Sequence, residues 1–271
     1  TLYTRNRGSG EGGNIDIGAD QDIRIENRSQ LISTVSSQGD AGNIELTAVS
    51  GRVTVQSGST ISSDVEDVED VDSADATGTG GDITIQGSTV TLQSVDEEGN
   101  SILDEEGNPV LTKISANTSG SGDAGSIQIT STDDDGDLTT NELSITQTAI
   151  TASSEGAGDA GSILIAATGV NLLDDEGNLD INNIPQGAEI GDVAINDSQL
   201  ENDGFGNNID ILGGTVDLSN TQITIATAGS GEGGSNAIGV TSTENGNNPD
   251  NGNNLDIVEL EVRNSNLTAA A

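Results

Sequence analysis

The chain of 271 residues contains no cysteine, histidine, tryptophan or methionine, and it has one tyrosine and one phenylalanine. Without cysteine there is no disulfide framework, no thiolate metal site and no cysteine nucleophile. Without histidine, the side chain that most often serves as a general base is missing. Aromatic residues make up only 1% of the chain, so a conventional mixed-layer enzyme core is hard to build. We therefore predict that the protein is not an enzyme.

Positive charge is also scarce, because 7 Lys and Arg residues face 46 Asp and Glu residues, for a formal net charge of −39. Binding to nucleic acid would require basic side chains that displace phosphate counterions, so no nucleic-acid partner is expected. No stretch approaches the roughly 18 apolar residues of a membrane-spanning helix, so no membrane span is expected.

High net charge with few aromatic residues is also the composition of a disordered chain, but the order of the residues favours strands. Aliphatic and polar residues alternate in short runs such as Ile15-Asp16-Ile17, Val53-Thr54-Val55 and Ile83-Thr84-Ile85. A period of two is typical of strands with one buried face. The sequence therefore predicts an aliphatic core made of strands.

The chain repeats a unit that begins with a turn of small residues, followed by one polar residue and an apolar strand. A second block adds two more short apolar stretches, as in Val53 and Val55 before Ile61. Three short strands per unit predict an all-β fold, a single-stranded parallel β-helix solenoid with loop and hairpin insertions. We expect a single β-helix domain over residues 1–271 with about six to seven coils. The coil starts lie near Gly12, Gly42, Gly81, Gly125, Gly161, Asn208 and Asn254.

One polar position recurs directly after the small-residue turn of each unit. Stacked coils would place these side chains above one another, where we expect them to hydrogen-bond in a ladder. The glycines that precede them are interpreted as residues of tight turns. The ladder positions are Asn14, Asn43, Asp82, Ser126, Ser162, Asn208 and Asn254.

Extra residues fall between the strand patterns and predict surface insertions. Asp96–Asn100 and Asp104–Asn108 share the sequence Asp-Glu-Glu-Gly-Asn between apolar arms, which predicts two hairpins. Glycine at the fourth place supplies the positive φ that such turns need.

The segment Asp133-Asp134-Asp135-Gly136-Asp137 concentrates carboxylates around a flexible glycine. Hard cations require several oxygen ligands at once, so Asp133, Asp135 and Asp137 are candidate ligands of a calcium ion. The segment lacks the downstream glutamate of an EF-hand, and we favour the alternative of a solvated acidic loop. No other cofactor is predicted.

Three of the turns share one pattern of small residues: Gly39-Asp40-Ala41-Gly42-Asn43-Ile44, Gly122-Asp123-Ala124-Gly125-Ser126-Ile127 and Gly158-Asp159-Ala160-Gly161-Ser162-Ile163. They resemble the repeats of filamentous-haemagglutinin-like exoproteins of the two-partner secretion route, especially the cyanobacterial ones. The resemblance covers nearly the whole chain. It implies a right-handed parallel β-helix, secretion across the bacterial outer membrane, and an extracellular or cell-surface role in adhesion or in a biofilm matrix. The absence of cysteine is compatible with export of an unfolded chain.

Both ends of the sequence match the third-strand phase of the repeat, and no polar cap is recognisable at either end. Head-to-tail contacts that do not close generate filaments. We therefore predict a structural subunit or segment of an acidic surface fibre that self-associates head to tail, with cell-surface or matrix polysaccharide as a further partner. The alternatives are a passive stalk of a large secreted adhesin and, less favoured, a carbohydrate-active β-helix enzyme.

Overall fold

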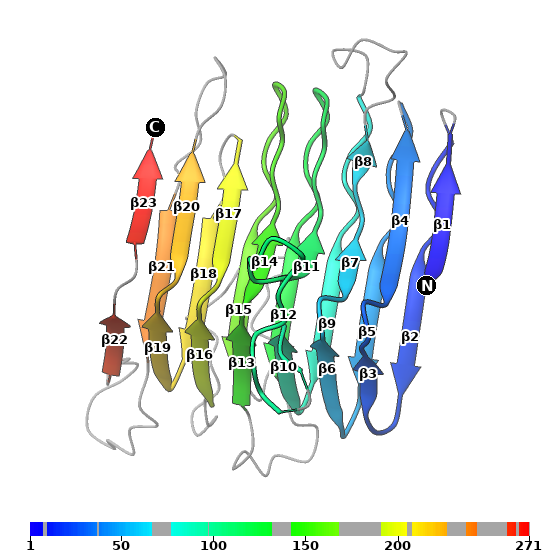
Figure 1. Ribbon diagram of the computed structural model, residues 1–271. Helices are drawn as coiled ribbons and strands as arrows, with labels where there is room; N and C mark the ends of the chain where they lie inside the picture. Colours follow the sequence, from blue (N-terminus) through cyan, green and yellow to red (C-terminus); the bar gives the residue numbers. More distant parts are fainter. Residues whose placement is uncertain are drawn as a thin grey trace, which may run out of the picture.

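The structure is a computed structural model that describes residues 1–7, 10–36, 38–66, 77–96, 98–131, 142–167, 191–204, 208–226, 237–242, 259–263 and 266–270. Within these residues there is no helix, and the strands form three parallel sheets. Figure 1 shows the strands side by side in one long stack, from the blue N-terminal strands to the red C-terminal strands. The predicted fold class, an all-β parallel β-helix solenoid, is confirmed.

The three sheets are named A, B and C. Sheet A contains β1 (Leu2–Asn6), β4 (Gln30–Ser36), β7 (Thr60–Ser62), β8 (Val65–Glu66), β11 (Thr112–Ser115), β14 (Thr148–Thr151), β17 (Gln199–Asp203), β20 (Gln222–Ala226) and β23 (Asn266–Ala270). Sheet B contains β2 (Ile15–Ala19), β5 (Ile44–Ala48), β9 (Ile83–Gly87), β12 (Ile127–Ser131), β15 (Ile163–Ala167), β18 (Asn208–Gly213) and β21 (Ala237–Ser242). Sheet C contains β3 (Ile23–Ile25), β6 (Arg52–Gln56), β10 (Thr89–Gln93), β13 (Glu142–Thr146), β16 (Asp192–Asn196), β19 (Thr215–Ser219) and β22 (Glu259–Arg263).

The chain winds through the sheets in a fixed order, because each strand of sheet B is followed by one of sheet C and then one of sheet A. Each strand pairs in parallel with the equivalent strand of the next coil, so the stack advances about 4.8 Å per coil. Apart from the two-residue β8, which pairs with β4 off the main order of sheet A, edge strands of the described sheets are therefore confined to their two ends.

Identical or similar aliphatic side chains stack in columns inside the solenoid. In sheet B, Ile44, Ile83, Ile127 and Ile163 are register partners in successive coils, and each is at most 1% exposed. Their polar neighbours in the strands point outward, as the period of two predicts. Burying each such side chain contributes about 1.5–3 kcal/mol, so the columns are the main source of stability.

Glycines form columns of their own at the turns that enter sheet B. A Cβ atom on Gly42 would lie 2.5 Å from the carbonyl oxygen of Gly13, and one on Gly125 would lie 2.3 Å from that of Gly81. One on Gly161 would lie 1.8 Å from the carbonyl oxygen of Gly125. None of these glycines has a positive φ. The chain needs glycine here because successive coils approach closely, a different reason from the predicted tight turn.

The corners between sheets C and A depend on left-handed backbone conformations in residues other than glycine. The φ angles are 59° at Asn27, 56° at Arg28, 61° at Ser57, 49° at Gln147, 51° at Asp197 and 49° at Asn220. Short polar side chains such as Asn and Asp tolerate this region best, which fits three of these six residues.

At one of these corners, residues 95–111 are inserted between β10 and β11. On either side of the insertion, Ser94 N donates to Thr146 O at 3.2 Å and Thr112 N donates to Gln147 O at 3.1 Å. Stacking on the next coil therefore continues unchanged across the insertion.

Both predicted hairpins lie in this insertion. The two Asp-Glu-Glu-Gly-Asn segments are closed by isolated antiparallel bridges, Val95 to Ser101 and Leu103 to Pro109. The fourth residues have positive φ angles, 82° at Gly99 and 85° at Gly107, as predicted. Backbone hydrogen bonds from Asn100 and Asn108 lower the pKa values of Asp96 and Asp104 respectively.

Candidate functional site

Five of the predicted ladder positions lie in one line beside sheet B, and we call this line from Asn14 to Ser162 the turn row. Each side-chain oxygen accepts a hydrogen bond from the backbone N–H of the next member. The donor–acceptor pairs are Asn43 N to Asn14 Oδ1 at 2.9 Å, Asp82 N to Asn43 Oδ1 at 2.9 Å, Ser126 N to Asp82 Oδ1 at 2.9 Å, and Ser162 N to Ser126 Oγ at 3.3 Å.

This geometry differs from a ladder of stacked amides, because the side chain only has to accept. An aspartate or a serine can therefore occupy a position that asparagine holds elsewhere in the turn row. Asn208 follows next in register, since Ile163 pairs with Ile209. Asn254 lies outside the described residues, as do the calcium candidates Asp133, Asp135 and Asp137.

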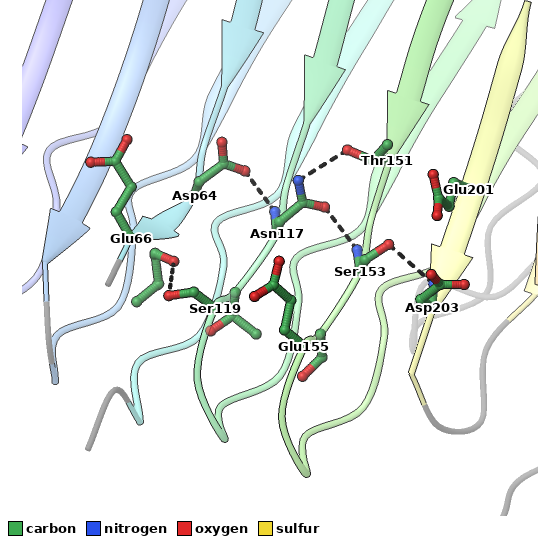
Figure 2. Close-up of a pocket in the computed structure, with 12 residues that line it drawn as sticks. Asp64, Glu66, Asn117, Ser119, Thr151, Ser153, Glu155, Glu201 and Asp203 are labelled. Atoms are coloured by element: carbon green, nitrogen blue, oxygen red, sulfur yellow. Dashed lines mark hydrogen bonds between the residues drawn. The ribbon is translucent and has the colours of Figure 1, made fainter. Parts of the chain in front are cut away.

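A surface groove of about 610 Å³ runs along sheet A, where the strands end and the chain turns away (Figure 2). Its lining comes from successive coils, so residues far apart in sequence lie next to one another. We call it the acidic groove. It is lined by Asp64, Val65, Glu66, Asn117, Thr118, Ser119, Thr151, Ser153, Ser154, Glu155, Glu201 and Asp203.

Four of these residues form a second polar line along the groove, the groove row of Asp64, Asn117, Ser153 and Asp203. Figure 2 shows it as a chain of dashed lines. Asn117 N donates to Asp64 Oδ1 at 2.7 Å, Ser153 N to Asn117 Oδ1 at 2.9 Å, and Asp203 N to Ser153 Oγ at 3.1 Å. The hydrogen bond is the same as in the turn row, but all four groove residues are half-buried.

Asp64 is the most heavily bonded carboxylate of the groove. Besides the Asn117 N–H, it accepts hydrogen bonds from the hydroxyl groups of Ser62 at 2.5 Å and Ser115 at 2.8 Å, both at Oδ2. Asn117 in turn donates through Nδ2 to Thr151 Oγ1 at 3.0 Å. The Asp64 carboxylate therefore connects its own coil to the next one and has a structural role.

The carboxyl groups of Glu201 and Asp203 are less well stabilised by hydrogen bonds than that of Asp64. Partial burial, then a hydrogen bond to Asp203 and the negative charge of Asp203, raise the pKa of Glu201. Asp203 Oδ1 is enclosed and accepts no hydrogen bond from the described part of the chain. Outside the groove, burial raises the pKa of Asp210 on sheet B.

The groove carries five carboxylates, and none of its described lining residues is Lys or Arg. Arg5 reaches Glu66 from outside, with 3.4 Å between Nη2 and Oε2. Both side chains are solvent-exposed, so this pair contributes at most about 1 kcal/mol. Among the described residues, no three His, Cys, Asp or Glu side chains are placed to hold one metal ion. The lining therefore accepts hydrogen bonds and offers negative charge, without an assembled cation site.

The groove row was not among the predicted positions, although the sequence carries a signal for it. Each member stands three residues after an inward aliphatic residue of sheet A, as Asp64 does after Ile61 and Asn117 does after Ile114. Ser153 after Ile150 and Asp203 after Leu200 follow the same spacing. A polar residue at this offset therefore marks the groove row in the sequence.

Comparison with known proteins gives no relative: no family model, no curated protein and no solved structure matches the chain. The described residues form no helix that is long and apolar enough to cross a membrane.

Proposed function

We propose that this chain is a structural segment of an extracellular β-helical surface fibre, with a role in adhesion or in a biofilm matrix and without catalytic activity. The observation that carries the proposal is the unbroken register of the three sheets. The same inward positions stack from β2 to β20 while the 95–111 insertion is confined to a corner. A stack in which the internal strands of each main ladder pair on both sides suits a mechanically stable rod.

The chemistry of the acidic groove supports a structural role. Asp64 accepts three hydrogen bonds from its own and the next coil, and these bonds connect the two coils. The chain has no histidine and a single lysine, Lys113, and its two aromatic residues offer little surface for stacking sugars.

Secretion across the bacterial outer membrane and a place outside the cell belong to the same proposal, and both rest on the likeness of the glycine turns to filamentous-haemagglutinin-like repeats. Head-to-tail self-association would continue the sheet A pairing beyond β1 and β23. Matrix polysaccharide is the proposed second partner. For the 133–137 segment the proposed role is a solvated acidic loop, with calcium binding as the less favoured alternative.

Electron microscopy of the purified chain over a concentration series, with calcium and with a chelator, tests the proposal. Thin filaments with an axial repeat near one chain's length are expected. Isolated short rods under every condition would contradict self-association and favour the passive-stalk alternative. Turnover of a neutral or acidic polysaccharide, lost on Asp or Glu substitution in the groove, would overturn the non-catalytic assignment.

A further inference from the structure

Glu201 and Asp203 stand two residues apart on β17 and face the acidic groove together, because strand residues at i and i+2 share a face. Between them, Asn202 points inward and is fully buried, and its Nδ2 donates to the carbonyl oxygen of Gly161. The strand is thereby held in position, and the two carboxyl groups cannot separate by a local shift of the backbone.

The described residues of the groove supply no positive charge to this pair. On the coil before, the groove presents Thr151, Ser153 and the further acid Glu155. On the coil after, the register partners of Glu201 and Asp203 are Thr224 and Ala226, which do not titrate. Ser153 Oγ accepts the Asp203 N–H, and no hydroxyl group of the described residues donates to Asp203 Oδ1.

Asp203 Oδ1 is thus enclosed, negatively charged in the ionised state, and without a donor in the described part of the chain. An enclosed acceptor without a donor costs free energy, and two ionised carboxylates side by side cost more. Figure 2 places the two carboxyl groups next to each other at one end of the groove. The Glu201 carboxyl becomes a donor to this atom by taking up a proton.

We propose that Glu201 and Asp203 form an acid-closed latch, in which protonated Glu201 donates a hydrogen bond to Asp203 Oδ1 and tightens this coil of the solenoid. The step consumes one proton from solvent and forms one O–H···O hydrogen bond. This device concerns the stability of one coil and does not depend on the fibre function proposed above.

The sign of the effect follows from the raised pKa of Glu201, whose ordinary value is 4.5. The folded chain holds the proton more tightly than the unfolded chain. The latch therefore stabilises the fold fully below the ordinary pKa, and this contribution is lost as the pH rises through the raised pKa. Because Glu201 remains exposed on one side, solvent screening keeps the effect modest.

The test compares thermal unfolding of the wild type, Glu201→Gln and Glu11→Gln between about pH 4 and about pH 8 at fixed ionic strength. In Glu201→Gln the new side-chain amide donates at every pH, so this variant should unfold about 2 °C higher than the wild type at about pH 8 and gain less on acidification. Glu11→Gln removes the same charge from an exposed residue outside the groove and controls for relief of general repulsion. Equal behaviour of the two variants would overturn the latch.

Direct titration separates the latch from an unrelated change in folding. In protein labelled at the glutamate carboxyl carbon, the NMR resonance that disappears in Glu201→Gln should titrate above the ordinary value, and its midpoint should fall in Asp203→Asn. A midpoint at or below 4.5 in the wild type, or one that Asp203→Asn leaves unchanged, would refute the pairing.

Discussion

Two polar rows run along the solenoid, and in both a side-chain oxygen accepts a hydrogen bond from the backbone N–H one coil further on. The turn row beside sheet B is mostly exposed, whereas every member of the groove row beside sheet A is half-buried. Each turn-row residue follows a glycine, while the groove row follows Ser63, Ala116, Ala152 and Asn202. In the groove row, the residue before each acceptor can therefore carry a Cβ atom. In the turn row, the residue before each acceptor is glycine, because the coils approach too closely there for a Cβ atom.

The largest loss of folding stability is expected where an added Cβ atom would lie closest to the neighbouring coil. In Gly161→Ala the new Cβ would lie 1.8 Å from the Gly125 carbonyl oxygen, so the coils must separate next to the turn row. We expect a loss of about 3 kcal/mol or failure to fold. Gly18→Ala is the matched control, because nothing lies within 4 Å of its added Cβ. Circular dichroism melting compares the two, and equal melting temperatures would show that the glycine column is not needed for close stacking.

A smaller loss of stability is expected when one acceptor is removed, and it should be larger in the half-buried groove row than in the exposed turn row. Asn117→Ala removes the acceptor of the half-buried Ser153 N–H and the donor to Thr151, at an expected cost of about 1–3 kcal/mol. Asn43→Ala removes the acceptor of the Asp82 N–H, which water can replace, so about 0.5–1.5 kcal/mol is expected. Urea unfolding measures both variants. A larger loss in Asn43→Ala would mean that exposure does not distinguish the rows.

The smallest effect comes from exchanging the amide for a carboxylate. Asn43→Asp keeps the accepting oxygen, as Asp82 does naturally in the same row, so stability should change by less than about 0.5 kcal/mol. Asn117→Asp loses the donor to Thr151 and adds a charge to a groove that already holds five, so its loss should exceed that of Asn43→Asp. The difference should shrink on acidification, and the same urea series at two pH values checks it.

The strands were predictable because their signal is local. Alternation such as Val53-Thr54-Val55 gives the inward face directly, and the repetition of Asn43 and Asp82 after small residues gives the turn-row positions. Gly99 and Gly107 were predicted to take a positive φ because Asp-Glu-Glu-Gly-Asn is a self-contained turn.

Features that depend on the distance between coils were not predictable. The role of Gly161 depends on its approach to Gly125 in another coil, a distance that the spacing of glycines in sequence does not give. Glu201 and Asp203 could not be distinguished among 46 acidic residues, because their surroundings are formed by residues of other coils that are distant in sequence.

Residues 95–111 leave the rod at one corner and return to it with the stacking intact on both sides, between Ser94 and Thr112. That corner is therefore a splice point, where chain length can change without altering the coils above and below. Since each coil adds about 4.8 Å along the axis, the choice of corner fixes the height at which a spliced segment is displayed. Segments inserted at corners of different coils would therefore be displayed at fixed intervals along the solenoid axis.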